Sequence, residues 1–192
     1  MAAIPQPNRM SVEAYLELDR NDPDHRYEYH NGAISMMSGG SADHSIIKIN
    51  LTTELKHLLR GSGCHVFDSD LRVQLSATRY VYPDAMVSCD PADWGRRDTA
   101  LTPLVVFEVL SPSTQAYDLG RKADLYRACS TIEEIVLIHF DHAQIDLYRR
   151  AEKFWHFQSF KVGEEVPLTS LGITLAVDAL YDEIEFQPDD AP

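Results

Sequence analysis

Hydrophobic and polar residues repeat along this chain with two periods, which together predict a mixture of helices and strands. Apolar positions recur at helical spacing over residues 12–18 and between Ser41 and Gly61, and a serine that can cap a helix starts each segment. Two β-rich stretches flank Asn31-Gly32, the dipeptide favoured at two-residue hairpin turns. The amino-terminal part therefore predicts a helix, a hairpin and a longer helix.

Extended patterns dominate the rest of the chain and are separated by short polar turns. The expected strands are residues 27–30, 33–37, 65–67, 71–75, 80–88, 104–110, 134–140, 144–149 and 154–160. A further helix begins between Ser113 and Asp118, and a β extension near 171–175 leads into a short helix near 177–181. We expect one α/β domain over residues 1–186, with a central mixed sheet flanked by helices, and a disordered tail at 187–192.

One strand contains an acid where every neighbour is apolar. Residues 104–110 read as a strand that is buried on both faces, yet Glu108 lies near its carboxyl end. A buried carboxylate is costly unless it is paired or binds a metal, so Lys122 on the following helix and a divalent cation are the two expected partners. We expect Lys122 to point toward Glu108 rather than toward Asp118, because the effective dielectric is lower around a desolvated carboxylate.

A second acid follows a proline in the neighbouring strand. Pro83 cannot donate a ladder hydrogen bond, which indicates an edge, a bulge or a strand end at which Asp84 is turned toward something. We expect Asp84 and Glu108 to converge at one solvent-accessible end of the sheet. Two carboxylates on rigid strands suit Mg²⁺ or Mn²⁺, either of which can activate water and neutralise charge on a phosphodiester.

Structural roles for the same residues compete with this interpretation. Asp84 could cap a turn, and Glu108 and Lys122 could form a buried structural ion pair. Lys122 could also pair with Asp118 on the helix surface, four residues away.

Composition limits the partners and the compartment. Thirty acids against 17 Lys and Arg give a formal charge of −13, which argues against broad nonspecific binding to nucleic acid or anionic membranes.

The three cysteines are odd in number and widely spaced, so we expect reduced thiols and no disulfide framework. Neither the amino terminus nor any later apolar run looks like a signal peptide or a membrane span, and we expect a cytoplasmic protein. The local basic groups are Arg96-Arg97, Arg121-Lys122, Arg127 and Arg149-Arg150.

The segments 82–84, 107–114 and 118–122 resemble the bacterial restriction endonuclease-like family called Uma-two, which belongs to the PD-(D/E)xK nuclease superfamily. The resemblance covers nearly the whole chain, and residues 108–114, EVLSPST, are its most specific part. It implies a restriction endonuclease-like fold with an N-terminal helix and hairpin and a C-terminal β extension.

The resemblance also implies roles for individual residues. Asp84 and Glu108 would bind Mg²⁺ or Mn²⁺, with the main-chain carbonyl of Val109 as a third ligand. Leu110 stands where the superfamily's short motif has its lysine, and Lys122 matches the displaced lysine of the family. Further positions that match the family, in a secondary role, are Glu28, His44 and Asp70.

These residues lead to a metal-dependent DNA endonuclease as the expected function. A homodimer is expected with it, because cutting two strands needs two sites. Two alternatives remain open: a catalytically inactive binding or scaffold protein that retains the nuclease fold, and a metal-dependent hydrolase of a small phosphorylated substrate. The acidic surface favours the alternatives, since proteins that embrace a duplex usually present basic surfaces. Whether the basic groups line one groove beside Asp84 discriminates among the three.

Overall fold

The computed structural model describes residues 9–37, 39–96 and 98–186, so the expected disordered tail lies outside the described residues. The helical elements are α1 (Val12–Asn21), α2 (Ala42–Leu58), the 3₁₀ turn η1 (Pro91–Asp93), α3 (Gln115–Tyr117), the π-helical turn η2 (Asp118–Lys122), α4 (Ala123–Ala128) and α5 (Val177–Leu180). In the part of the chain that is described, no helix is long and apolar enough to cross a membrane.

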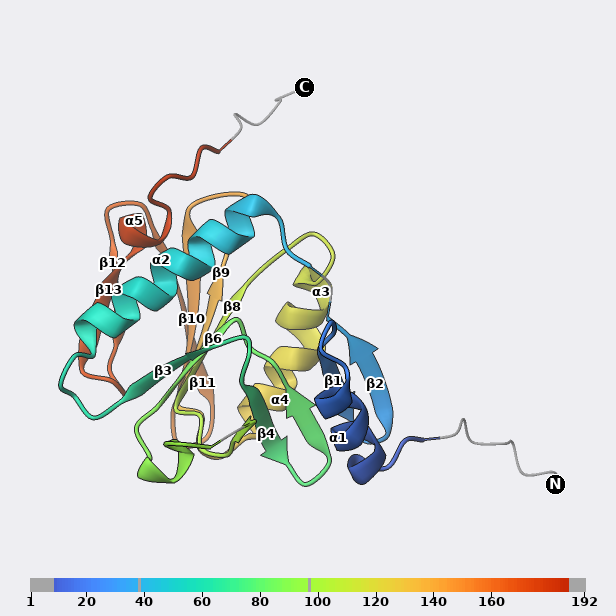
Figure 1. The fold of residues 1–192 in the computed structure, drawn as a ribbon. Helices are drawn as coiled ribbons and strands as arrows, with labels where there is room; N and C mark the ends of the chain where they lie inside the picture. Colours follow the sequence, from blue (N-terminus) through green and yellow to red (C-terminus); the bar gives the residue numbers. More distant parts are fainter. Residues whose placement is uncertain (1–8, 38, 97, 187–192) are drawn as a thin grey trace.

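The described residues contain thirteen strands, which form two larger sheets and one hairpin. Figure 1 shows their arrangement. The strands are β1 (Tyr27–His30), β2 (Ala33–Met36), β3 (His65–Asp68), β4 (Arg72–Ser76), β5 (Arg79–Val81), β6 (Ala85–Ser88), β7 (Thr99–Ala100), β8 (Val105–Val109), β9 (Glu134–Ile138), β10 (Gln144–Arg150), β11 (Trp155–Lys161), β12 (Glu165–Leu168) and β13 (Ile173–Ala176). The central sheet has the order β11-β10-β9-β8-β6-β3, and the second sheet has the order β2-β1-β5-β4-β7. The expected mixed α/β architecture is confirmed, because β8 and β9 run parallel while the other central pairs are antiparallel.

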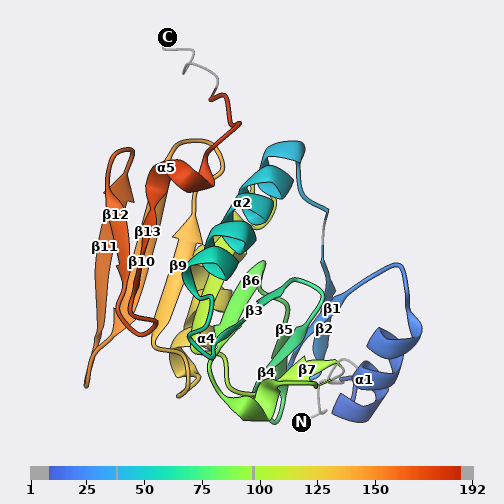
Figure 2. The same cartoon turned by 60° about the vertical axis from the view of Figure 1, so that its left-hand side comes forward.

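The central sheet is covered on both faces, which is why its middle strands β6, β8 and β9 are buried along their whole length. Every residue of β8 is buried, and alternate side chains enter two different cores. Val105, Phe107 and Val109 pack with α2, α5 and the β12–β13 hairpin, whereas Val106 packs with α4 and β4. The helix α2 contacts α5 and the strands β3, β6, β8 and β13. Figure 2 shows α1 beside the second sheet, away from α5 and the β12–β13 hairpin. Glu108 has the same parity as Val106 and therefore projects toward α4.

The strand expected over residues 80–88 is wrong in one respect, because two strands in different sheets occupy this stretch. β5 ends at Val81 and belongs to the second sheet, while β6 begins at Ala85 and belongs to the central sheet. Pro83 lies in the crossing, where no ladder hydrogen bond is required. The strand end that Pro83 indicated is confirmed, and it places Asp84 at the junction of the two sheets.

Local signals at the amino terminus are borne out. The side chains of Ser11 and Ser41 accept hydrogen bonds from the third residue of their helices, as capping residues do. Asn31 and Gly32 both have positive φ, as a two-residue turn of this type requires. The segment from Gln115 to Ala128 is continuously helical, and its start lies within the expected interval.

The expectation of three reduced thiols is wrong for two of the cysteines. Cys64 and Cys89 form a disulfide with their Cα atoms 4.0 Å apart, whereas Cys129 is free and buried. The cause is tertiary: antiparallel pairing of β3 with β6 sets His65 opposite Ser88, so the residues just outside this pair face each other. A separation of 25 residues in sequence gave no sign of this register.

Candidate active site

A cavity of about 520 Å³ lies at the junction of the two sheets. Its walls come from β1, β2, the start of α2, the residue before β6, the end of β8 and the helical segment from Thr114 onward. The lining includes the expected site residues Glu28, His44, Asp84, Glu108, Val109 and Lys122. Residues that are far apart in sequence therefore face one space.

Asp84 is held between α2 and the backbone of β8. Its Oδ2 accepts a 2.9 Å hydrogen bond from the Val109 N–H and lies 3.3 Å from His44 Nε2. Its Oδ1 lies 3.3 Å from Lys48 Nζ, one helical turn after His44. Burial raises the pKa of Asp84, but the His44 hydrogen bond and the charges of His44, Lys48 and Lys122 outweigh it and keep the pKa below its usual value. Asp84 is therefore an ionised carboxylate near neutral pH.

Glu108 has a different environment on the α4 side of the sheet. It is 3% exposed, its Oε1 lies 2.8 Å from Lys122 Nζ, and the same oxygen accepts a hydrogen bond from the Tyr126 hydroxyl. Burial raises the pKa of Glu108 well above its usual value; the charge of Lys122 opposes this, and the charges of Asp118 and Asp84 add to it. Asp84 and Glu108 face one cavity, yet the pKa of Asp84 is lowered and that of Glu108 is raised.

Lys122 is the common cation of several acids. Its Nζ lies 3.1 Å from Glu28 Oε1 and donates to the Tyr82 carbonyl at 3.1 Å, while Asp118 Oδ1 is farther away at 3.9 Å. The expected orientation toward Glu108 rather than Asp118 is confirmed. Burial lowers the pKa of Lys122, but Glu108 and Glu28 outweigh that effect, so the amine stays protonated.

Two local features of the backbone position these side chains. The π turn η2 carries Asp118 and Lys122. Such a turn inserts one extra residue into a helix, which changes the directions in which its side chains point. Gly40 lies against the His44 ring: a Cβ at residue 40 would come 2.6 Å from His44 Nδ1. The missing side chain of Gly40 leaves room for the imidazole that contacts Asp84.

Glu28, one of the secondary positions, is also brought to the cavity. Its Oε1 accepts from the Tyr82 N–H at 3.2 Å, and its Oε2 accepts from the Tyr117 hydroxyl at 2.8 Å. Asp70 is not brought there: its carboxylate is exposed and lies 3.9 Å from Arg26. The structural reason is that the loop before β4 turns Asp70 outward, while its neighbour Ser69 accepts a 2.8 Å hydrogen bond from Lys48.

Sequence reasoning missed Lys48, Tyr117 and Tyr126 as members of this cluster. Spacing could have found two of them, because Lys48 follows His44 by four residues and Tyr126 follows Lys122 by four, so each pair shares a helix face. Tyr117 gave no such signal, since it reaches Glu28 across 89 positions of the chain.

Comparisons with known proteins identify the family of this chain. The model of the Uma2 family, described as "Putative restriction endonuclease", matches residues 12–178. The chain belongs to the Uma2 family. An uncharacterized protein of Synechocystis sp. is 35% identical over 180 residues, covering 93% of this chain and 94% of that protein. A second one is 26% identical over 153 residues, covering 78% and 86%.

A crystal structure from Anabaena variabilis shares the fold of this Uma2 family member. That protein, described as "a putative nuclease belonging to DUF820", superposes with a TM-score of 0.74 at 18% identity, covering 90% of this chain and 98% of the other. The restriction endonuclease-like fold is therefore established, and fold and family together support a nuclease function.

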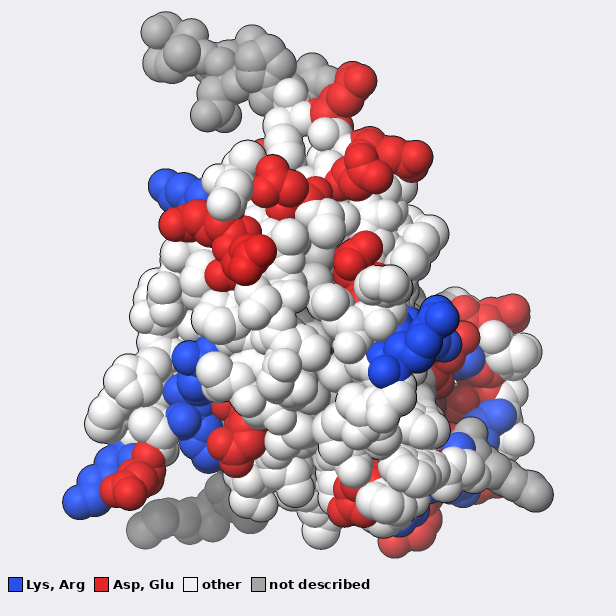
Figure 3. Space-filling model, turned by 90° about the vertical axis from the view of Figure 1, so that its left-hand side faces the viewer, with Lys and Arg blue, Asp and Glu red and all other residues white. Residues whose placement is uncertain are grey.

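Within the described ranges, the basic groups of this Uma2 family member do not gather in one groove beside Asp84. Of those described, Arg121 and Lys122 line the cavity. Arg96 pairs with Asp93, Arg127 pairs with Asp124, and Arg149 pairs with Glu134, while Arg150 donates to main-chain carbonyls. On the face shown in Figure 3, Lys and Arg likewise stand in separate groups, and acidic side chains gather on its upper part.

The donor set of the cavity suits a hard divalent cation held by few protein ligands. Asp84 and Glu108 supply carboxylate oxygens from the ends of neighbouring strands. Among the described residues, no three carboxylates of this cavity bring their ligand atoms within 4.8 Å of one another. Mg²⁺ usually takes one or two carboxylates and completes its shell with water and phosphate oxygens. The residues present therefore fit Mg²⁺ or Mn²⁺ bound mainly through Asp84 and Glu108.

Proposed function

We propose that this protein is a metal-dependent nuclease that hydrolyses phosphodiester bonds in DNA, with its reaction centre at Asp84, Glu108 and Lys122. The observation that carries the proposal is that these side chains, from three separate segments, line one cavity. The Uma2 family match and the nuclease-like fold support the same reaction class. Asp84 and Glu108 would hold Mg²⁺ or Mn²⁺, and the Val109 carbonyl is the proposed third ligand.

The chain's own residues supply binding, orientation and charge. A bound Mg²⁺ or Mn²⁺ would supply Lewis-acid charge for the phosphate and lower the pKa of a water molecule. His44, Lys48 and the Val109 N–H keep the Asp84 carboxylate ionised and fixed in orientation. Lys122 is the protonated donor that would hold a scissile phosphate oxygen or orient the attacking water, and Glu28 keeps its ammonium at the cavity wall.

The direct test is a cleavage assay on supercoiled plasmid and on single-stranded DNA, with Mg²⁺ or Mn²⁺ and with a chelator. We expect metal-dependent cleavage by the wild-type protein and none by Glu108→Gln. Glu165→Gln is the matched control, because Glu165 is an exposed acid on β12. No cleavage of either substrate with either metal, by folded wild-type protein, would remove the nuclease proposal.

A specific observation favours a second candidate, a metal-dependent hydrolase of a small phosphorylated substrate. The basic groups are scattered, and the cavity volume of about 520 Å³ is within the range of small-molecule sites. This candidate predicts hydrolysis of a small phosphodiester such as bis(p-nitrophenyl) phosphate that depends on Glu108 and Lys122, with DNA neither cleaved nor acting as a competitor. Competition by DNA favours the nuclease instead.

We also propose a homodimer, because cleavage of both strands of a duplex needs two such centres. Sedimentation equilibrium of the full chain measures its state directly. A monomer that still makes double-strand breaks in a single binding event would contradict this part of the proposal.

A further inference from the structure

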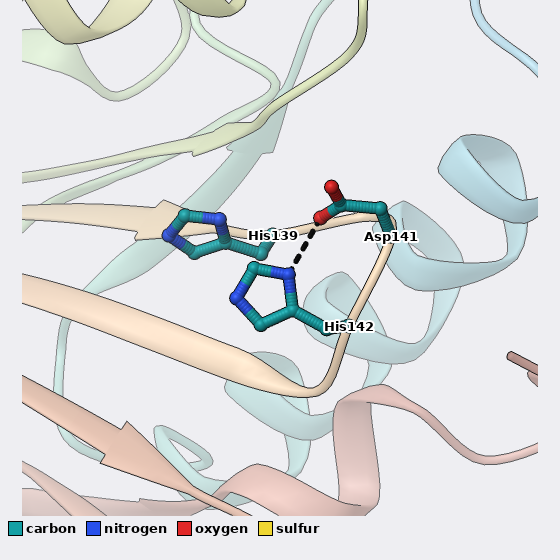
Figure 4. Close-up of side chains that lie close together, drawn as sticks. All are labelled: His139, Asp141 and His142. Atoms are coloured by element: carbon teal, nitrogen blue, oxygen red, sulfur yellow. Dashed lines mark hydrogen bonds and ion pairs between the residues drawn. The ribbon is translucent and has the colours of Figure 1, made fainter. Parts of the chain in front are cut away.

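A second cluster of ligand-bearing side chains lies at the turn between β9 and β10. One ligand atom each from His139, Asp141 and His142 lies within 4.8 Å of the others. Figure 4 shows both imidazole rings and the carboxylate converging at this turn. In the described ranges of the chain, no other group of three or more His, Cys, Asp or Glu side chains meets this criterion. Neither His139, Asp141 nor His142 lines the cavity at Asp84 and Glu108.

His139 is oriented as metal-binding histidines usually are. The residue is 8% exposed, and its Nε2 forms a 3.0 Å hydrogen bond with Asp146 Oδ2 on β10. Asp146 is fixed in turn, because its Oδ1 accepts from the Ser159 hydroxyl at 2.6 Å and from the Gln144 amide at 3.0 Å. A carboxylate on one ring nitrogen fixes the tautomer and makes the other nitrogen, here Nδ1, a better ligand. Figure 4 shows the His139 ring beside the His142 ring at this turn.

The other two side chains are accessible and already adjacent. The Asp141 and His142 side chains are 53% and 52% exposed, and His142 Nδ1 lies 2.7 Å from Asp141 Oδ1. The centroids of the His139 and His142 rings are 4.5 Å apart. Zn²⁺ takes imidazole nitrogen and carboxylate oxygen ligands at about 2.0–2.2 Å, and the two exposed side chains have room to adjust toward an ion beside His139.

We propose that His139, Asp141 and His142 form a binding site for one Zn²⁺ ion, separate from the proposed Mg²⁺ site. Two imidazoles and one carboxylate suit Zn²⁺, whereas Mg²⁺ prefers a shell made only of oxygen. His139 Nδ1, a carboxylate oxygen of Asp141 and one ring nitrogen of His142 are the protein ligands. The exposure of the turn leaves the fourth tetrahedral position to water.

Such an ion would strengthen the end of the sheet that carries the proposed active site. His139 directly follows β9, and β9 pairs with β8 so that the Leu110 N–H donates to the Ile138 carbonyl at 2.8 Å. An ion at the turn clamps the β9–β10 connection next to the strand that carries Glu108. Because the site needs the folded turn, Zn²⁺ should raise the thermal midpoint in a concentration-dependent way.

The test is calorimetric titration of the full chain with Zn²⁺ after chelator treatment, combined with thermal melts and Co²⁺ ligand-field spectra. We expect one Zn²⁺ per chain in the wild-type protein and at least a tenfold loss of affinity in His142→Ala. His25→Ala is the matched control: His25 is exposed and pairs with Asp22 at 3.1 Å, and it is not part of the cluster of three. Asp146→Asn should weaken binding by about 10- to 100-fold without removing a ligand.

One further variant separates this site from the proposed active site. Glu108→Gln should keep the Zn²⁺ titration and the tetrahedral Co²⁺ spectrum of the wild-type protein, whatever it does to DNA cleavage. Wild-type affinity in His142→Ala would overturn the proposal, and so would loss of Zn²⁺ binding in Glu108→Gln together with its retention in His142→Ala. Because His142 is exposed, its removal should leave the fold intact, and unchanged circular dichroism of the variant checks this.

Discussion

Lys122 Nζ lies 2.8 Å from Glu108 Oε1, and both side chains are almost completely shielded from water. The lysine is held in place from other sides by Glu28 and by the Tyr82 carbonyl. Such a pair is costly to desolvate and gives little net stability, so its presence in a cavity with Asp84 needs another reason. The proposed role in catalysis would supply that reason, and the following variants test it.

Replacing Glu108 by Gln should leave the metal-free protein at least as stable as wild type. The pKa of Glu108 is raised by burial, so a neutral isostere removes an unfavourable charge. The midpoint shift caused by Mg²⁺ should disappear in this variant and persist in Glu165→Gln. Thermal melts with and without Mg²⁺ measure both effects, and an unfolded Glu108→Gln protein would establish a purely structural ion pair.

The same pKa gives a pH dependence with a definite sign. A carboxyl group whose pKa is raised in the folded state retains a proton that the unfolded chain releases, so the metal-free protein should lose stability as pH rises above about 4.5, the usual value for Glu. In the proposed site, Mg²⁺ would replace that proton, and its stabilising effect should therefore grow with pH over the same window. Urea unfolding across a pH series measures this trend, which Glu108→Gln should flatten.

Asp84 should give the opposite dependence in a separate window. Its pKa is lowered in the folded state, so its contribution to stability is complete above about 3.8, the usual value for Asp, and is lost as pH falls below it. The Asp84→Asn variant should therefore differ from wild type less in acid than at neutral pH. Stability can be compared at about pH 3 and about pH 7, which lie on either side of the usual Asp pKa. Equal stability differences between variant and wild type at both pH values would contradict the assignment of Asp84 as the ionised carboxylate.

Lys122→Met should abolish cleavage while Mg²⁺ binding survives. The substitution keeps the length of the side chain and removes the charge, leaving buried acids without their cation, and such a loss typically costs about 3–5 kcal/mol of unfolding free energy. Because Mg²⁺ can replace the missing charge, it should restore more stability in this variant than in wild type. Lys56→Met, at an exposed position of α2, is the control. Full activity of Lys122→Met would show that the displaced-lysine assignment is wrong.

Gly40→Ala should act on the cavity through His44. The added Cβ would meet the imidazole at 2.6 Å, so the ring or the backbone at residue 40 must shift, and we expect the contact of His44 with Asp84 to be disturbed. We expect a measurable loss of activity with a midpoint change of only a few degrees, on the order of 1 kcal/mol. Gly39→Ala is the matched control, since nothing lies within 4 Å of a Cβ built there. Equal activities of the two variants would remove His44 from the positioning of Asp84.

Local sequence determined the elements of this fold and part of its site. The local signals are the serine caps, the Asn31-Gly32 turn and the apolar strand that contains Glu108. Each lies within a few residues of the chain, so local backbone geometry is enough to predict the element. The same is true of Pro83, which cannot continue a ladder and so indicated the strand end at Asp84. The sequence also predicted that Lys122 would face Glu108, and the two side chains are in contact.

Only the tertiary structure decided which distant residues meet. It divided residues 80–88 between two sheets, joined Cys64 to Cys89, turned Asp70 outward and kept the basic groups apart. Strand order and register determine each of these outcomes. That order and register arise because the two faces of the central sheet pack against different partners. No local pattern records that choice, because the energies that fix it belong to contacts between segments that are far apart in the chain.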